Sequence, residues 1–295
     1  MKKIFITGGT GGVGSEVSLF LGDKYQVYSG TTNENAKIRN CKMILIDITD
    51  REKLIKTITE INPDYIIHLA ALTDVNLCEE KKEQAWKINV EGTKNVTLAA
   101  ERVGAKLIYA STNYVFDGEK GMYAEEDEPS PVNYYSLTKV KGEKEALNYS
   151  NSIVTRLCPF GLGAENRQTF TTRVIQELSK GGKINLFTDQ FFSPIFTYNY
   201  VQVLEKLFES DFTGIINIAG SERLSRYEFV KKIADIFELD SNLLNPTKIE
   251  DLDEVAKRPR DTSLDISKAK SLFGDIFPDA ESGIRQMKRI RDKDI

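Results

Sequence analysis

The sequence predicts an α/β protein with a Rossmann-type, doubly wound parallel sheet and a smaller C-terminal substrate-binding region. Short runs of β-branched and apolar residues alternate with longer amphipathic stretches in the first half of the chain. A glycine-rich turn follows the first run, and a tyrosine and a lysine four residues apart come after the fifth. Strand–helix alternation favours a parallel sheet because each parallel crossover needs a long connection, usually a helix.

The predicted strands are nearly continuous apolar runs, as burial on both faces of a parallel sheet requires. They cover Lys3–Thr7, Gln26–Ser29, Met43–Ile46, Tyr65–Leu69, Lys106–Ala110 and Ile153–Leu157. Helical periodicity fills the intervals between them, over Gly12–Leu21, Arg51–Ile61, Glu83–Val103 and Asn133–Asn148. We therefore expect a dinucleotide-binding Rossmann domain in residues 1–157.

The alternation loosens after residue 157, and residues 158–295 are expected to form mainly the substrate-binding region. Residues from about 190 to about 220 are expected to return to the first sheet. Further predicted elements are helices over Thr169–Ser179 and Arg226–Phe237, strands over Ile184–Phe187 and Gly214–Ile218, and a polar loop over Asp240–Arg260.

Composition limits the class of protein. The chain has 295 residues and a formal net charge of −4, so we expect no nucleic-acid partner, which would need clustered Lys and Arg. No apolar run reaches membrane-spanning length, so no membrane partner is expected. Cys41, Cys78 and Cys158 show neither metal-ligand spacing nor a disulfide framework, which indicates a cytoplasmic protein without a metal site.

The glycine-rich turn is typical of a dinucleotide site. Gly8, Gly11 and Gly14 lie between an apolar strand and a helix, where free backbone N–H groups and the helix dipole attract a pyrophosphate. Gly8 permits the tight turn, Gly11 the close approach of the ligand, and Gly14 the packing of helix on strand. An ordinary turn is the alternative, which the flanking strand and helix disfavour.

The end of the second predicted strand bears on the choice of cofactor. An acidic residue there would bind the ribose 2′-OH and favour NAD. The chain instead has hydroxyl groups, including that of Thr31, followed by Lys37 and Arg39. These suit a 2′-phosphate, so we expect NADP, with NAD as the alternative. Asp47 and Ile48 follow the third strand and are expected to hold the adenine, unless Asp47 caps the next helix instead.

Tyr135 and Lys139 are expected to perform proton transfer. Residues four apart on a helix lie on one face. A nearby ammonium stabilises phenolate and lowers the tyrosine pKa from its usual value of about 10. A tyrosine so placed can protonate a carbonyl oxygen as hydride reaches the carbon. Tyr227 and Lys231 have the same spacing, but lie outside the Rossmann domain and are interpreted as a structural coincidence.

Thr112 is the third candidate catalytic residue. It follows the fifth predicted strand, and ligands of an open parallel sheet bind beyond the carboxyl ends of its strands. Its hydroxyl is expected to bind the substrate oxygen and the tyrosine. The alternative for Ser111 and Thr112 is ordinary turn chemistry. His68, the only histidine, ends a predicted strand and is expected to be packed and hydrogen-bonded rather than catalytic.

These motifs resemble the extended short-chain dehydrogenase/reductase family, and most closely its dTDP-4-dehydrorhamnose reductase branch. The resemblance covers nearly the whole chain, with the glycine loop and four further segments: His68–Glu79, Asn89–Thr93, Ser111–Gly118 and Arg258–Asp265. It implies a modified Rossmann fold with a C-terminal nucleotide-sugar region. It further implies reduction of a 4-keto-6-deoxy nucleotide sugar to the alcohol.

The resemblance also implies roles for individual residues. Thr112, Tyr135 and Lys139 would be catalytic, and Asn89 would support the active-site helix. The residues expected against the cofactor are Gly8, Gly11, Val13, Gly14, Thr31, Asp47, Ile48, Ala70 and Ala71. The residues expected to contact substrate are Asn113, Val115 and Phe116.

The chain departs from the family pattern at two positions. Asn113 replaces an aspartate after the catalytic threonine, and Pro159 replaces an aromatic residue. Both positions face the substrate in the family, so the substrate of this chain could carry a sugar or nucleotide other than those of the dTDP-rhamnose precursors. Some members bind a metal at a dimer interface, and Glu16 matches one ligand. We interpret Glu16 as a surface residue; a homodimer is an open expectation.

The leading hypothesis is an NADP-dependent reductase of a nucleotide-activated keto-deoxysugar. Two alternatives remain. A nucleotide-sugar epimerase or dehydratase would use the same tyrosine and lysine, but a dehydratase is expected to carry an acidic pair where Asn113 and Tyr114 stand. The second alternative is a regulatory subunit that binds NADP without turnover. The presence of all three candidate catalytic residues, Thr112, Tyr135 and Lys139, disfavours it.

Overall fold

A seven-stranded parallel sheet forms the centre of the protein, in a computed structural model that describes residues 1–164, 167–251 and 256–293. The strand order is β11-β6-β5-β4-β1-β2-β3, and every pairing in this sheet is parallel. The strands are β1 (Lys3–Thr7), β2 (Gln26–Thr31), β3 (Cys41–Leu45), β4 (Tyr65–His68), β5 (Lys106–Ala110), β6 (Ser152–Leu157) and β11 (Gly214–Ile218). The predicted doubly wound α/β fold is confirmed.

The strand order reverses between β1 and β4. The chain first builds outward from β1 through β2 to β3, and then returns to pair β4 on the other side of β1. At such a reversal the connections leave in opposite directions, which opens a crevice beyond the carboxyl ends of the strands. The glycine loop after β1 and the segment after β4 both border this crevice.

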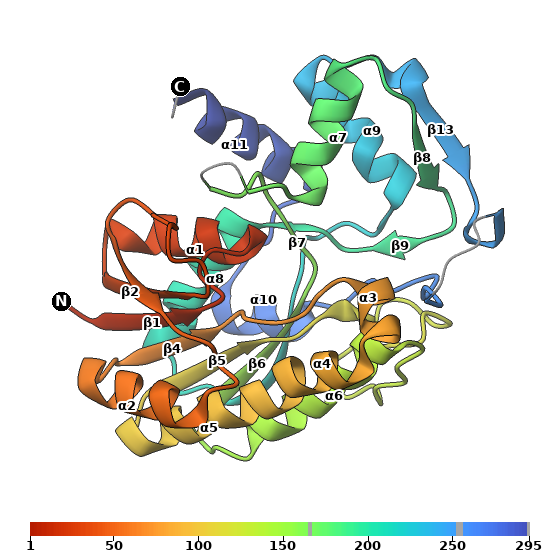
Figure 1. The fold of residues 1–295 in the computed structure, drawn as a ribbon. Coiled ribbons are helices and arrows are strands. Elements are labelled where there is room, and N and C mark those ends of the chain that lie inside the picture. Colours follow the sequence, from red (N-terminus) through yellow and green to blue (C-terminus); the bar gives the residue numbers. More distant parts are fainter. Residues whose placement is uncertain (165–166, 252–255, 294–295) are drawn as a thin grey trace.

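One face of the sheet is covered by α2 (Arg51–Ile61), α5 (Gly92–Val103) and α6 (Tyr134–Leu147) (Figure 1). Phe5 of β1 and Leu107 of β5 point to this face and pack in one apolar cluster with residues of α2 and α5. Successive strand residues alternate between faces, so the neighbours of Phe5 serve the other layer.

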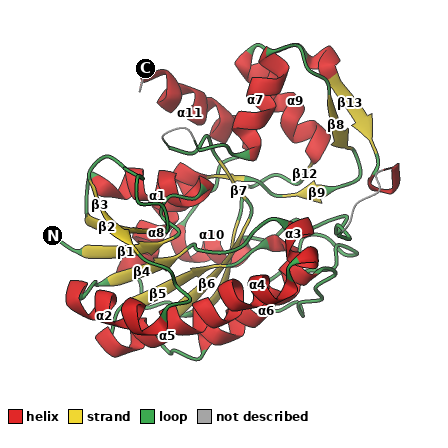
Figure 2. Cartoon of the chain, in the orientation of Figure 1, coloured by secondary structure: helices red, strands yellow, loops and turns green. Residues whose placement is uncertain are grey.

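The opposite face is covered by α1 (Gly12–Gly22), α8 (Thr197–Glu209) and α10 (Ser267–Phe273) (Figure 2). Ile4 and Ile6 of β1 share an apolar cluster with Tyr200 and Leu204 of α8. Segments from the second half of the chain therefore complete the first sheet: α8 covers it, and β11 extends it beside β6.

The remaining C-terminal elements form a separate apolar cluster around α7 (Phe170–Ser179), α9 (Arg226–Phe237) and α11 (Ala280–Lys293) (Figure 1). A parallel pair, β8 (Ile184–Phe187) and β13 (Leu244–Thr247), borders this cluster. There are two further short strand pairs: β7 (Pro159–Phe160) runs parallel to β10 (Ile195–Phe196), and β9 (Phe191–Phe192) runs antiparallel to β12 (Leu224–Ser225).

Two predicted elements differ from the observed ones. The helix expected over Glu83–Val103 consists of α4 (Lys82–Trp86), a π-helical turn (Lys87–Glu91) and α5, because one widened turn interrupts the regular hydrogen bonding. The loop expected over Asp240–Arg260 contains the strand β13. Its sequence is polar and does not predict a strand, but pairing with β8 supplies hydrogen-bond partners for its backbone. Residues 252–255 of that loop lie outside the described residues.

Elements that the sequence did not predict include the short helix α3 (Val75–Glu80), the longer helix α8 and three 3₁₀ turns: Asn113–Val115, Ser241–Leu243 and Ile249–Asp251. Within the described ranges, no helix has both the length and the apolar character that a membrane crossing demands.

Replacement of Leu204 by alanine tests the role of α8 in the first core. Leu204 is fully buried, so Leu204→Ala should lower the free energy of unfolding by about 2–5 kcal/mol through lost burial and an unfilled cavity. Urea unfolding monitored by circular dichroism measures this change. Leu147→Ala, at a leucine that is 37% exposed at the end of α6, is the control and should cost well under half as much. Equal losses would contradict the packing described.

Candidate active site

A cavity of about 890 Å³ opens beyond the carboxyl ends of β1, β4 and β5, between the sheet and the second region. This volume lies in the range of about 300–1,000 Å³ typical of small-molecule sites. The glycine loop, the segments after β4 and β5, and α6 line it from the first sheet. The segment after β6, together with α7 and α9, lines it from the second region.

Two glycines of the loop, Gly8 and Gly14, leave no room for side chains. Gly8 has φ +65°, and a Cβ there would lie 2.7 Å from the Ala70 backbone. A Cβ on Gly14 would lie 2.1 Å from the Gly8 carbonyl oxygen. Gly11 is the N-cap of α1 and has no side chain to bind the first N–H groups of the helix. Those groups border the cavity and can bind an anion, as a pyrophosphate site requires.

The expected cofactor contacts all line this one cavity: Gly8, Gly11, Val13, Gly14, Thr31, Asp47, Ile48, Ala70 and Ala71. The Oγ1 atoms of Thr31 and Thr10 lie 2.8 Å apart, which joins the end of β2 to the glycine loop. Asp47 does not cap α2; Asp50 does, by accepting from the Lys53 N–H at 3.1 Å. Asp47 instead accepts from the Thr49 N–H through Oδ1 at 2.8 Å, and it also lines the cavity.

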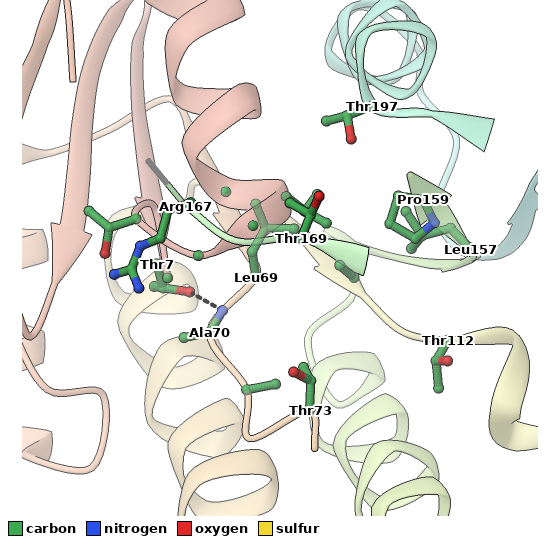
Figure 3. A pocket seen from close by; sticks show the side chains of 18 of the residues that line it. Thr7, Leu69, Ala70, Thr73, Thr112, Leu157, Pro159, Arg167, Thr169 and Thr197 are labelled. Atoms are coloured by element: carbon green, nitrogen blue, oxygen red, sulfur yellow. Dashed lines mark hydrogen bonds between the residues drawn. The ribbon is translucent and has the colours of Figure 1, made fainter. Parts of the chain in front are cut away.

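The cations expected beside a 2′-phosphate are not on this wall. Lys37 and Arg39 are exposed and do not line the cavity. Arg167, from the segment that precedes α7, does line it (Figure 3). Sequence patterns did not indicate Arg167, because its position depends on how the second region folds back over the sheet.

His68 orders the end of β4. Its Nδ1 lies 2.7 Å from Thr7 Oγ1, and its Nε2 lies 2.9 Å from Thr93 Oγ1. Thr7 Oγ1 in turn accepts from the Ala70 N–H at 3.3 Å (Figure 3). Complete burial, and secondarily the charge of Lys139, lowers the pKa of His68 to about 3. The histidine is thus a packed, neutral residue, as expected.

Thr112, Tyr135 and Lys139 meet at the cavity wall. Asn133 caps α6 by accepting from the Ser136 N–H at 2.9 Å, which fixes the first turn and hence Tyr135. Burial raises the pKa of Tyr135, and a hydrogen bond with Thr112 opposes that shift. The expected lowering of this pKa by Lys139 is not observed, because the loss of hydration on burial outweighs every stabilising contact of the phenolate.

Lys139 is held beneath the cavity with a buried ammonium. Its Nζ donates to the Ala110 carbonyl at 2.8 Å and lies 4.2 Å from the centroid of the Tyr109 ring. Burial lowers the pKa of Lys139 to about 7, while the charge of Glu143 acts in the opposite direction. A lysine with this pKa can change its protonation state near neutral pH.

Asn89 connects the segment after β4 to the catalytic helix. Its Nδ2 donates to Thr138 Oγ1 at 2.9 Å and to the Leu72 carbonyl at 3.0 Å. Its Oδ1 accepts from the Leu72 N–H at 2.8 Å. Asn89 lies in the π-helical turn, a feature that often accompanies functional sites. It contacts α6 as the family resemblance implies.

Arg226, at the start of α9, brings a positive charge to the cavity wall. Its guanidinium lies 4.0 Å from the centroid of the Phe192 ring, and its Nε donates to Gln190 Oε1 at 3.3 Å. Its other polar contacts are with Tyr114 and Cys158. Since no carboxylate of the described residues forms an ion pair with it, Arg226 is available to an anionic ligand.

Comparisons with known proteins agree with this geometry. A family model described as the RmlD substrate binding domain matches residues 1–291. The chain belongs to this family. The expected resemblance to the extended short-chain dehydrogenase/reductases, and to their dTDP-4-dehydrorhamnose reductase branch, is confirmed.

Three proteins similar to this RmlD-family chain illustrate the range of names among its relatives. A probable low-salt glycan biosynthesis reductase, Agl14 of Haloferax volcanii, is 29% identical, with 96% of each chain covered. Methionine adenosyltransferase 2 subunit beta of Rattus norvegicus is 30% identical over 92% of this chain and 82% of its own. The crystal structure of dTDP-4-dehydrorhamnose reductase from Bacillus anthracis, in complex with NADP, has a TM-score of 0.88 and 27% identity, covering 98% of this chain and 100% of that one.

The residues expected to contact substrate do not line the cavity. Asn113 is buried and donates through Nδ2 to Thr262 Oγ1 at 2.6 Å. Val115 is in the main apolar cluster, and Phe116 stacks on Tyr123 with ring centroids 4.1 Å apart. The 3₁₀ turn after Thr112 directs these three side chains behind the wall. Of the two positions that depart from the family pattern, only Pro159 lines the cavity.

Glu16 is buried, so its interpretation as a surface residue is wrong. It is 5% exposed and lines the cavity, because the segment after β7 folds over the first turn of α1. Its Oε1 accepts from the Leu162 N–H at 3.0 Å. Burial raises its pKa to about 7, although contacts with Thr197, Leu162 and Gly163 act against the shift. The described part of the chain has no group of three or more His, Cys, Asp or Glu residues arranged to hold a metal ion.

His68 and Glu16 should make opposite contributions to stability between pH 5 and pH 7. The pKa of His68 is lower in the folded protein, so its contribution is lost as the pH falls below the unfolded value of about 6.5. The pKa of Glu16 is higher in the folded protein, so its contribution is present at low pH and is lost as the pH rises through about 7. Each effect amounts to about 2 kcal/mol between pH 5 and pH 7.

Urea unfolding at pH 5 and pH 7 separates the two contributions. His68→Gln leaves Glu16 unopposed, so the free energy of unfolding should increase by about 2 kcal/mol, relative to the wild type, on going from pH 7 to pH 5. Glu16→Gln leaves His68 unopposed, and the same change of pH should reduce it by about 2 kcal/mol. An identical pH dependence in both variants would contradict the burial described.

Proposed function

We propose that the protein is an NADPH-dependent reductase of a 4-keto-6-deoxy nucleotide sugar. One observation supports this most: a single cavity brings the glycine loop, the Thr112–Tyr135–Lys139 set and the cation Arg226 together. The first suits a dinucleotide, the second a carbonyl to be protonated, and the third an anionic group on the substrate. The similarity to dTDP-4-dehydrorhamnose reductases supports the same activity.

The cofactor would lie along the glycine loop, with its pyrophosphate at the N-terminus of α1 and its adenine near Asp47 and Ile48. When bound, its nicotinamide supplies a hydride to the substrate carbon. The absence of an acidic residue at the end of β2 supports NADP, as does the NADP bound to the similar reductase from Bacillus anthracis. Arg167 and Lys87 are then wall residues with the charge to bind a cofactor phosphate, and NAD is the second choice.

The protein side of the reaction requires one proton. Tyr135 donates its phenolic proton to the developing alkoxide oxygen, and Thr112 binds the same oxygen and orients Tyr135. The phenolate left on Tyr135 needs a neighbouring cation, since burial disfavours its charge. Lys139, one helical turn away, supplies that cation when it is protonated.

Arg226 would bind the diphosphate of the nucleotide sugar. A guanidinium binds phosphate oxygens in pairs, and its stacking on Phe192 fixes the plane of the guanidinium. The sugar would then extend from Arg226 toward Tyr135 along the wall that includes Pro159. With proline in place of the family's aromatic residue, this wall favours a sugar or nucleotide other than the dTDP-rhamnose precursor. We also propose residues 1–157 as the cofactor domain, residues 158–295 as mainly the substrate region, and the cytoplasm as the location.

Replacement of Tyr135 by phenylalanine tests the reaction. Tyr135→Phe removes only the proton donor, so kcat for NADPH oxidation with a nucleotide 4-keto sugar should fall about 10²–10⁴-fold while the Kd for NADPH stays within about twofold. Tyr227→Phe is the matched control, since Tyr227 is also followed by a lysine four residues later, and it should retain full activity. Full activity in Tyr135→Phe would refute the mechanism. Tight NADPH binding without turnover by the wild type, on any sugar of a panel, would favour a regulatory subunit.

Replacement of Arg226 by glutamine tests the substrate site. Arg226→Gln should raise KM for the nucleotide sugar about 10–100-fold, as expected for lost hydrogen bonds to a charged group, with no change in the Kd for NADPH. Arg223→Gln is the control, because Arg223 pairs with Asp261 and does not line the cavity. Its KM should equal that of the wild type. A parallel loss of cofactor affinity in Arg226→Gln would place Arg226 at the cofactor instead.

A further inference from the structure

Glu143 continues the catalytic face of α6. Tyr135, Lys139 and Glu143 follow one another at intervals of four residues, so their side chains lie along one side of the helix. Lys139 is 4% exposed and Glu143 is 3% exposed. A buried carboxylate is costly unless it is paired and hydrogen-bonded, so its partners indicate why it is there.

Glu143 joins three elements of the active site. Arg156, in β6, donates to it twice, from Nε at 3.0 Å and from Nη2 at 2.9 Å. Ser111 donates its hydroxyl to Glu143 Oε1. Ser111 lines the cavity and directly precedes Thr112. Glu143 therefore fixes the segment that carries Thr112 to the helix that carries Lys139.

The tyrosine and histidine side chains around Lys139 carry no negative charge near pH 7, in contrast to Glu143. Tyr135 shares its helix, while Tyr109, whose ring faces the ammonium, and His68 belong to neighbouring strands; all three are neutral near pH 7. Among the described residues, the hydrogen bond that Lys139 donates goes to the neutral carbonyl of Ala110. Arg156 reduces the field of Glu143 by pairing with it, but does not cancel it.

We propose that Glu143 is a positioning residue, which keeps the Lys139 ammonium charged and, through Ser111, holds Thr112 in place. The role in turnover rests on the proposed reductase function, whereas the effect on Lys139 does not. Without Glu143 the buried ammonium loses a negative charge that stabilises it, so Lys139 becomes neutral at a lower pH. The Tyr135 phenolate then forms without a neighbouring cation.

The charge on Lys139 can be measured directly in the full-length protein without cofactor. Lysine labelled with ¹³C at Cε reports protonation by NMR, and the Lys139 resonance is assigned by its loss in Lys139→Arg. The wild-type midpoint is expected near 7, and that of Glu143→Gln about one pH unit or more lower. Glu143→Asp keeps the charge and should restore most of the shift.

Glu145→Gln, the same substitution on the same helix, is the matched control and should leave the midpoint unchanged. An unchanged midpoint in Glu143→Gln would overturn the proposal and leave Glu143 with a structural role alone. If Glu143→Gln does not fold, the double variant Glu143→Gln, Arg156→Met removes both buried charges together. That variant should also show a lowered midpoint, by less than Glu143→Gln because the positive charge of Arg156 is removed as well, and a wild-type midpoint there would equally refute the proposal.

Kinetics test the consequence for turnover. In the wild type, kcat for NADPH oxidation should fall as the pH rises through the Lys139 midpoint. In Glu143→Gln this fall should occur at lower pH by the shift that NMR measures, while KM for NADPH changes less than about twofold. Matching kcat profiles despite a shifted midpoint would refute the role in turnover. If no nucleotide sugar is reduced by the wild type, the proposed function fails, and the NMR result still decides the effect of Glu143 on Lys139.

Discussion

The reversal of strand order between β1 and β4 determines where the reacting groups lie. Because all strands of the sheet are parallel, the segments that follow them emerge at one edge. Three segments that are far apart in the sequence therefore converge at this edge: the glycine loop after β1, the segment after β4, and Thr112 after β5. Helix α6, packed against the same sheet, adds Tyr135 and Lys139 to this edge, and the second region closes the cavity above it.

Burial of charged and polar groups gives the site its chemistry. Loss of hydration lowers the pKa of Lys139 and His68 and raises that of Tyr135 and Glu16. At pH 7 His68 and Tyr135 are neutral in water as well, so burial costs stability mainly at Lys139 and Glu16, whose charged forms water favours. This cost is offset by the apolar clusters on both faces of the sheet, where Ile4 and Phe5 are fully buried. The stability of the core thus offsets the cost of burying ionisable groups at its edge.

The sequence was sufficient for the parts of the site that follow from local pattern. Apolar runs and glycine spacing located the strands of the first sheet and the turn after β1, and the interval of four located Tyr135 and Lys139. The same interval extends to Glu143 and could have been read. Arg226 and Arg167 could not, because their positions depend on how a region with weak periodicity packs over the sheet. Glu16 is a similar case. A carboxylate just after a glycine loop is expected at the surface, and it is the segment with Leu162, which lies over it, that buries it.

Residues behind the wall show the limit of a family pattern. Val115 and Phe116 belong to a motif near the catalytic threonine, yet a single 3₁₀ turn sends them into the core. A motif preserves the order of residues, whereas the direction of each side chain follows from backbone dihedral angles that the motif does not specify.

The π-helical turn over Lys87–Glu91 has a consequence for how this chain tolerates changes of length. A π turn is equivalent to one extra residue inserted into an α-helix. Its deletion would restore regular helical hydrogen bonding, but would rotate everything beyond it by about 100° about the helix axis. The apolar side of α5 would then turn away from α2, and Asn89 would lose either Leu72 or Thr138. The site therefore depends on the number of residues in this helix as well as on their identities.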